Sequence, residues 1–197
     1  VELAGSIQVL TNATTTAGSV DFSTTVDADD AAANDHYLVV NAGGGSVALN
    51  GAVGATERLD GLDVDGATVS VGAISTEDGS ALIGATANTY AVDLNATVGV
   101  LSFALPGAAA AVNTNGDPNG GAVNLTGSGG IELDDVDGAG TGGRQLSVVT
   151  DGGAGGTVDV NSAVDDANTD TNPNTLLLQA GGGDVAFDAA VGGGFPL

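Results

Sequence analysis

The feature that most restricts how this chain can fold is an internal repeat. Residues 19–55, SVDFSTTVDADDAAANDHYLVVNAGGGSVALNGAVGA, align without a gap on residues 157–193, TVDVNSAVDDANTDTNPNTLLLQAGGGDVAFDAAVGG, and 15 of the 37 positions are identical. The shared order of Val-Asp, Val-Asp, Asn, Leu, Ala-Gly-Gly-Gly, Val-Ala and Ala-Val-Gly is more than a composition effect. Two copies of one structural unit therefore lie 138 residues apart, as in proteins built from stacked repeats.

A shorter spacing inside the repeat indicates the secondary structure. Val20 and Val47 are 27 residues apart, and so are Val158 and Val185. Segments such as SVALN, TVSVG and TVDV alternate apolar and polar residues between Gly, Asn and Asp, and no segment has a convincing helical period. We therefore expect an all-β protein with short strands and almost no helix.

Two all-β architectures fit such strands, a right-handed parallel β-solenoid and a β-sandwich. A sandwich has turns about every 8–12 residues and normally a core with large aromatic residues, but only 3% of this chain is aromatic. In a solenoid, coils stack about 4.8 Å apart, so equivalent Val, Leu, Ile and Ala residues form interior ladders. We predict one solenoid domain over residues 1–197 with about eight coils, keep the sandwich as the alternative, and place Val20, Val47, Val158 and Val185 in the interior ladder.

The repeated units carry a resemblance to a known family, and residues 38–76 are an example. Residues 38–76, LVVNAGGGSVALNGAVGATERLDGLDVDGATVSVGAIST, resemble the glycine-rich repeats of filamentous-haemagglutinin-type adhesins and related giant bacterial surface proteins. The resemblance covers most of the chain and marks no functional residue. The family's N-terminal secretion domain is not visible in this sequence. It implies a right-handed parallel β-helix, secretion, and an adhesive or scaffolding role.

The charge of the chain restricts its partners. It has 25 Asp and Glu residues against Arg58 and Arg144, which gives a net charge of −23. Nucleic acid is excluded as an expected partner, because binding phosphates requires Lys and Arg. Residues 98–112 are the most apolar run, but they are too short and too interrupted by Pro106 and Gly107 to span a bilayer. We expect no membrane insertion and an extracellular or cell-surface location.

Few residues could support catalysis. The only histidine, His36, lies in AAANDHYL and is interpreted as a surface-loop residue before a strand. With one histidine, no lysine and no cysteine, no Ser-His-Asp set or Cys/His metal cluster can be assembled. A polysaccharide lyase would need a Lys, Arg or Tyr base beside calcium ligands, and the two tyrosines and two arginines are too few to favour one. We expect no enzymatic activity.

Acidic clusters are the candidate cation sites. Oxygen-rich loops suit Ca²⁺. We expect bulging loops at LDDVDGAG (133–140) and at VDADDAAAND (26–35) and VDDANTDTN (164–172), which occupy equivalent places in the two copies of the repeat. The candidate ligands are Asp134, Asp135, Asp137, Asp27 and Asp165. The alternative is that these loops only keep the protein soluble. No other cofactor is expected.

Three asparagines lie in Asn-x-Thr sequons. They are Asn12, Asn95 and Asn124. Each could carry a glycan if the source organism glycosylates asparagine.

The ends of the chain suggest an assembly. Carried past residue 193, the repeat aligns residues 52–59 (AVGATERL) with residues 190–197 (AVGGGFPL), and the next residues then align with the start of the chain. Both termini would thus lie in mid-coil, so that two copies complete one coil. A solenoid end exposes unpaired backbone groups beside apolar residues and favours an open, filamentous contact. The predicted junction residues are Leu3, Ile7, Val9, Val191, Phe195, Pro196 and Leu197.

These observations leave three functional hypotheses. The leading one is a non-catalytic structural subunit or segment of an extracellular filament, with copies of itself as partners. The second is a passive stalk of a giant adhesin. The third is a carbohydrate-binding or carbohydrate-cleaving β-helix, in which surface glycans are the partners.

Overall fold

The computed structural model describes most of the chain. The described residues are 1–11, 17–29, 36–77, 82–83, 86–87, 90–105, 109–114, 121–134, 143–150, 156–166, 173–193 and 197. Within them, every regular element is a β-strand. The predicted junction residues Phe195 and Pro196, the calcium candidates Asp135 and Asp137, and the sequon residue Asn12 lie outside the described residues.

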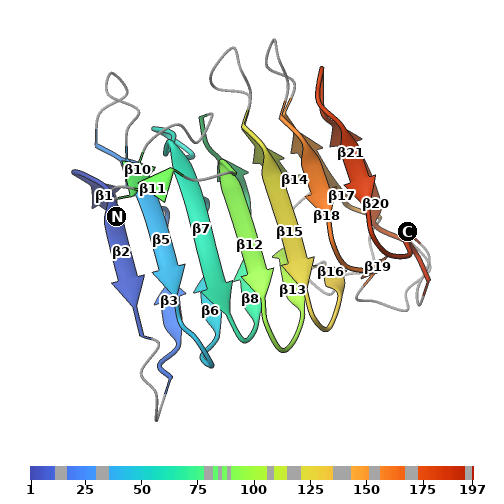
Figure 1. The fold of residues 1–197 in the computed structure, drawn as a ribbon, viewed down its shortest axis with the longest axis horizontal. Coiled ribbons are helices and arrows are strands. Elements are labelled where there is room, and N and C mark those ends of the chain that lie inside the picture. The colour runs from blue at the N-terminus through green and yellow to red at the C-terminus, as the bar shows by residue number, and fades with distance from the viewer. Residues whose placement is uncertain are drawn as a thin grey trace.

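Sheet 1 is the longest sheet and has seven parallel strands. Its strands lie side by side in chain order across the front of Figure 1, from blue to red, and the two termini lie at opposite ends of the row. In order they are β2 (Ile7–Leu10), β5 (Tyr37–Asn41), β7 (Gly61–Gly66), β12 (Val92–Ala96), β15 (Val123–Gly127), β18 (Val158–Val160) and β21 (Val185–Phe187).

Two further parallel sheets accompany it. Sheet 2 has the strands β3 (Val20–Phe22), β6 (Val47–Leu49), β8 (Val69–Val71), β13 (Leu101–Ala104), β16 (Ile131–Asp134) and β19 (Val164–Asp166). Sheet 3 has the strands β9 (Ile74–Ser75), β14 (Ala109–Asn113), β17 (Gln145–Val149) and β20 (Thr175–Gln179). A parallel pair, β1 (Glu2–Leu3) and β4 (Asp27–Ala28), continues the line of sheet 3 through bridges from Val26 to Val53 and from Val53 to Ile74.

The chain visits the three sheets in rotation. From β7 onwards the order is sheet 1, sheet 2, sheet 3 and back to sheet 1, and each return adds the next parallel strand. Only β10 (Leu82–Ile83) and β11 (Thr86–Ala87) pair antiparallel among the described strands. Antiparallel pairing defines a β-sandwich, so the sandwich alternative does not fit. The all-β prediction is confirmed, and the parallel sheets are compatible with a β-helix.

The core is built from columns of inward-facing apolar side chains. Strands β12 and β15 alternate buried and half-buried residues along their length, as the period of two predicts. One inward column runs through Leu38, Leu62, Val92, Val123 and Val158, each in register with the next strand and each 0% exposed. Columns of Val and Leu therefore supply the buried apolar surface of the core, because aromatic residues are scarce.

The single valine ladder predicted from the sequence is corrected to two. Val20 pairs with Val47 in sheet 2, whereas Val158 pairs with Val185 in sheet 1. Val47 and Val158 are buried, but Val20 is only partly buried and Val185 is 42% exposed. The outer members lie in the end strands β3 and β21, each of which has a neighbour on one side only among the described strands.

Glycines with a positive φ lie at several corners between strands. Gly43, between β5 and β6, and Gly181, between β20 and β21, both have φ of 56°, a conformation that favours glycine. A Cβ on Gly45 would lie 2.4 Å from the carbonyl oxygen of Gly18 in the neighbouring layer. The Ala-Gly-Gly-Gly sequence therefore provides both a left-handed turn and a close approach between layers.

Corners with longer loops are closed by threonine instead. In each, the threonine hydroxyl donates to a glycine carbonyl, and the glycine N–H donates back to the threonine carbonyl. The pairs are Thr11 with Gly18, Thr114 with Gly121 and Thr150 with Gly156, with hydroxyl-to-oxygen distances of 2.5, 2.6 and 2.6 Å. These closures explain how the 27-residue spacing can vary without disturbing the strands.

Candidate functional site: the two ends of the stack

The C-terminal end of the stack is apolar and open. β21 is the last strand of sheet 1, and β20 is the last strand of sheet 3. Val185, Phe187 and Val191 are 42%, 42% and 45% exposed, although their equivalents in the preceding layer are buried. A hollow at this end is lined by Thr175, Leu176, Leu178, Val185, Phe187, Val191 and Leu197. The hollow lies where the inward-facing apolar columns of the core end.

The N-terminal end carries the matching apolar edge. β2 begins sheet 1 and β3 begins sheet 2, so each has one side that no other described strand pairs with. Val1, Ile7 and Leu10 are 57%, 41% and 53% exposed. Both ends of the stack therefore combine unpaired strand edges with exposed apolar side chains, which is the combination that promotes strand addition.

The predicted junction residues divide into two groups. Ile7 and Val191 are exposed, as a junction requires, whereas Leu3 is only 2% exposed because it packs into the core of its own chain. Val9 and Leu197 are partly buried against that same core, and Leu197 also lines the C-terminal hollow. Leu3 therefore has little surface left to offer a second copy.

The outer surface of sheet 1 carries a ladder of carboxylates and amides. Asp63 and Asp93 are register partners, and Asn124 and Asp159 continue their column. The Asn124 amide donates to Asp93 over 2.7 Å, and Asn95 donates to Asp65 over 2.9 Å. Amide side chains between the carboxylates thus relieve part of the repulsion within the ladder.

Burial changes the acidity of this ladder. Loss of water contact, with Asp65 and Asp93 adding to it, raises the pKa of Asp63 to about 6. Burial likewise raises the pKa of Asp93, while its bond from Asn124 opposes that increase. Burial, and then the nearby carboxylates, raise the pKa of Tyr37, whose hydroxyl donates to the Tyr90 carbonyl over 2.9 Å. The sequence alternation places these aspartates on the outer face but does not reveal their partial burial.

Three of the calcium candidates lie in strands and not in loops, which corrects the expectation of bulging loops. Asp27 is in β4, is 8% exposed, and accepts a hydrogen bond from the Thr56 N–H over 2.9 Å. Asp165 is the half-buried middle residue of β19, and Asp134 ends β16. Among the described residues, no group of three acidic or histidine side chains is arranged to hold a metal ion. Calcium binding stays a prediction.

The two described sequon residues lie on the outer face of sheet 1. Asn95 is in β12 and Asn124 is in β15. The nitrogen that would carry a glycan donates to Asp65 in one case and to Asp93 in the other. A glycan at either position would have to replace that contact in the ladder.

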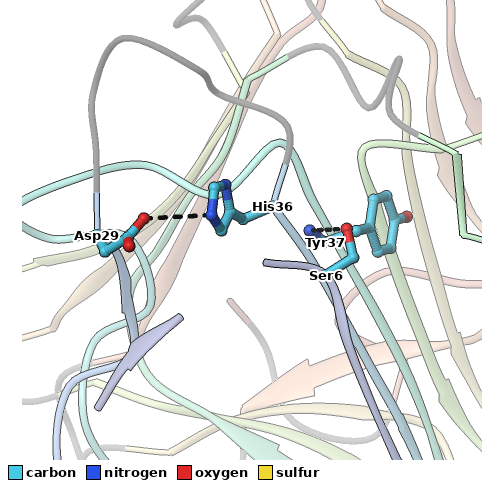
Figure 2. A network of polar contacts seen from close by, with 4 residues as sticks. All are labelled: Ser6, Asp29, His36 and Tyr37. Atoms are coloured by element: carbon cyan, nitrogen blue, oxygen red, sulfur yellow. Dashed lines mark hydrogen bonds and ion pairs between the residues drawn. The ribbon is translucent and has the colours of Figure 1, made fainter. Parts of the chain in front are cut away.

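His36 is buried, which corrects its interpretation as a surface-loop residue. It is 7% exposed, and its Nε2 lies 3.2 Å from a carboxylate oxygen of Asp29 (Figure 2). Beside it, the Tyr37 N–H donates to the Ser6 hydroxyl over 3.1 Å, as Figure 2 also shows. The Tyr37 contact ties the start of β5 to the first residues of the chain, and the His36 contact ties it to Asp29, so both have a structural role.

A buried polar cluster near β19 was not anticipated from the sequence. Asn174 and Asp166 are each 2% exposed. The Asn174 N–H and side-chain amide donate to the two oxygens of Asp166 over 2.8 and 3.1 Å, and that amide also donates to the Leu133 carbonyl over 3.0 Å. Because the cluster lies within an acidic, Asn-rich segment, composition alone suggests a solvated loop.

Comparisons with known proteins add no identification. No protein-family model, curated protein or solved structure matches this chain. Within the described residues, no helix has the length and apolar character needed to cross a membrane.

Proposed function

We propose that this chain is a non-catalytic structural subunit or segment of an extracellular filament. In this proposal the three sheets wind as a right-handed parallel β-solenoid, and copies join head to tail through the two ends of the stack. The observation that carries the proposal is the exposure of apolar core residues, among them Ile7 at one end and Phe187 at the other, beside unpaired strand edges.

Three further properties support a mechanical role. The core is a set of continuous columns, so each layer is held by the layers on both sides of it. The described polar clusters are engaged in structural hydrogen bonds, as at Asp166 and Asp27. A net charge of −23 keeps the sides of such a rod soluble and apart, which favours contact through the ends.

The proposal is tested with the purified 197-residue chain. We expect sedimentation velocity to detect concentration-dependent growth at moderate salt, and electron microscopy to show unbranched fibres whose width is that of one stack. A chain that stays monomeric at every concentration and salt level, while folded by circular dichroism, would refute the proposal. A density map of the fibre would also determine the hand of the winding.

A further inference from the structure

The columns of the core define how a second copy fits. We propose that one copy docks on the next without rotation about the long axis, so that β2 of the second copy extends sheet 1 beside β21. In this register Ile7 lies on Val185, Val20 lies on Val191, and Val1 lies on Leu178. The inference rests on the proposed function and specifies the partner surface and its register.

Sheet 1 provides the first alignment. The column that starts at Ile7 runs in register through Leu38, Leu62, Val92, Val123 and Val158 to Val185. A second inward column starts at Val9 and ends at Phe187 through the same pairings. Both columns begin and end in apolar residues, so the same register carried across the junction keeps each column apolar.

Sheet 2 provides an independent alignment. Its inward column starts at Val20, continues through Val47 and reaches Val164, which bridges to Val191. Val191 is 45% exposed, and Val20 is partly buried. A second copy aligned on sheet 1 therefore also places an apolar residue over Val191.

The line of sheet 3 agrees with the other two. The Val1 amino group donates to the Thr25 carbonyl over 2.7 Å, and the Asp27 N–H donates to the Val1 carbonyl over 2.9 Å, which places Val1 beside Val26. From Val26 the column continues through Ile74 and Val112 to Leu178. All three lines thus begin and end in matching apolar residues.

The order of the sheets along the chain also continues across the junction. The last segments are β20 in sheet 3, β21 in sheet 1 and the Val191 bridge in sheet 2. The next sheet in rotation is sheet 3, and β1, in line with that sheet, opens the chain before β2 and β3. In the proposed register, β1 of the docked copy therefore lies in the line of sheet 3, which is the face that follows the Val191 bridge in rotation.

Charge is compatible with this register despite the acidity of the chain. The outward column of sheet 1 has carboxylates at Asp63, Asp93 and Asp159, but it begins at Gln8 and ends at Ala186. The junction therefore brings a neutral pair together in this column. Like charges facing each other across strands would weaken pairing, and here the carboxylates lie inside each copy.

Cysteine pairs test the register, because the natural chain has no cysteine. Two single variants, Gln8→Cys and Ala186→Cys, are purified separately, mixed, allowed to assemble and treated with a mild oxidant. Neighbouring strands lie about 4.8 Å apart, which is within the Cα separation of about 4.4–6.8 Å that a disulfide spans. We expect the mixture to form a disulfide-linked dimer, and each variant alone to remain monomeric on a non-reducing gel.

In a matched control, Asp184→Cys replaces Ala186→Cys. Position 184 is two residues before position 186 and therefore points to the same face of the sheet. The shift adds about 6.6 Å along the strand, which puts the pair beyond disulfide reach, so we expect at least about tenfold less dimer. If fibres form but the Asp184→Cys mixture cross-links as well or better, the register is wrong while the filament proposal stands. If neither fibres nor dimers form, both proposals fail.

Discussion

Gly43 and Gly181 have the same φ of 56°, although they are 138 residues apart and lie at corners between different sheets. Gly43 joins sheet 1 to sheet 2, whereas Gly181 joins sheet 3 to sheet 1. A second equivalent pair, Gly54 and Gly192, shares φ of 67°. The repeated unit is thus a strand–corner–strand segment that fits different faces of the stack, and the two copies are displaced by one face.

The Ala-Gly-Gly-Gly corner allows three alanine substitutions to be compared. Gly44→Ala should be nearly neutral, because the nearest atom to its new Cβ is 3.5 Å away. Gly43→Ala should cost about 1 kcal/mol of unfolding free energy, because of its positive φ. Gly45→Ala should cost more, because its Cβ would meet the Gly18 carbonyl at 2.4 Å. Urea unfolding measures the order, and equal effects at all three positions would contradict this account of the corner.

The buried Asn174 should be far more important than an exposed asparagine. Asn174→Ala removes the side-chain amide that donates to one oxygen of the buried Asp166 carboxylate and to the Leu133 carbonyl. The backbone donor of Asn174 remains, so we expect a loss of about 2–4 kcal/mol in unfolding free energy. Asn161→Ala, at an exposed position, is the control and should change stability by less than about 0.5 kcal/mol. Similar losses in both variants would show that the buried hydrogen bonds of Asn174 add no more stability than an exposed asparagine does.

Ionisation of the Asp63 carboxyl should lower the free energy of unfolding as pH rises. Its pKa in the folded chain is about 6, above the ordinary 3.8, so the folded state binds the proton more tightly than the unfolded state. The resulting cost develops between about pH 4 and 6 and is fully present above that range. Because Asp63 is only partly buried, Asp63→Asn should raise unfolding free energy by about 1–2 kcal/mol at pH 7.5 and hardly at all at pH 4.

A charge-matched control separates this effect from the net charge. Asp188→Asn removes the same charge from an exposed position. Guanidinium or thermal unfolding of both variants across pH 4 to pH 7.5 provides the comparison. If the two variants gain equally at pH 7.5, the stabilisation comes from reduced net charge and not from relief of the Asp63 site.

Calcium should promote assembly at lower ionic strength than sodium if the acidic clusters bind it. Sodium chloride only screens the charge of −23 per copy, whereas bound divalent ions neutralise it locally. We expect millimolar Ca²⁺ to lengthen the fibres and raise the melting temperature, and a chelator to reverse both. Equal effects of calcium and sodium at matched ionic strength would show that the acidic residues are solubilising only.

The strands and the repeat could be predicted because both depend on local pattern. Period-two alternation identifies inward positions such as Val158 wherever a strand is covered on both sides. The face on which each copy lies could not be predicted, because the three faces accept the same strand pattern. Val20 and Val158 are equivalent in sequence, yet pairing with the neighbouring layers places them in different sheets.

The polar sites were harder to predict for a different reason. Asp27, Asp166 and His36 lie in acidic or asparagine-rich segments whose composition suggests solvent exposure. Their partners do not follow from the strand pattern: Asp27 accepts from the Thr56 N–H, 29 residues away, whereas Asp166 accepts from Asn174 and His36 contacts Asp29. Burial of these carboxylates depends on which donors the folded chain places beside them, and sequence spacing does not contain that information.

Phe187→Asp should abolish assembly while leaving the single copy folded. Phe187 is 42% exposed, so the substitution should cost the isolated chain only about 1 kcal/mol. In the junction, the new carboxylate would be buried without a partner beside Val9 of the next copy, which should weaken association at least about a hundredfold.

Leu177→Asp is the matched control for Phe187→Asp. Leu177 is 43% exposed in β20 and is the register partner of Ser147, outside the inward columns. Both variants add one negative charge, so a loss of fibres in electron micrographs for Phe187→Asp alone assigns the effect to the end face. An equal loss in both would assign it to charge repulsion, and fibres of normal length from Phe187→Asp would place the contact elsewhere on the molecule.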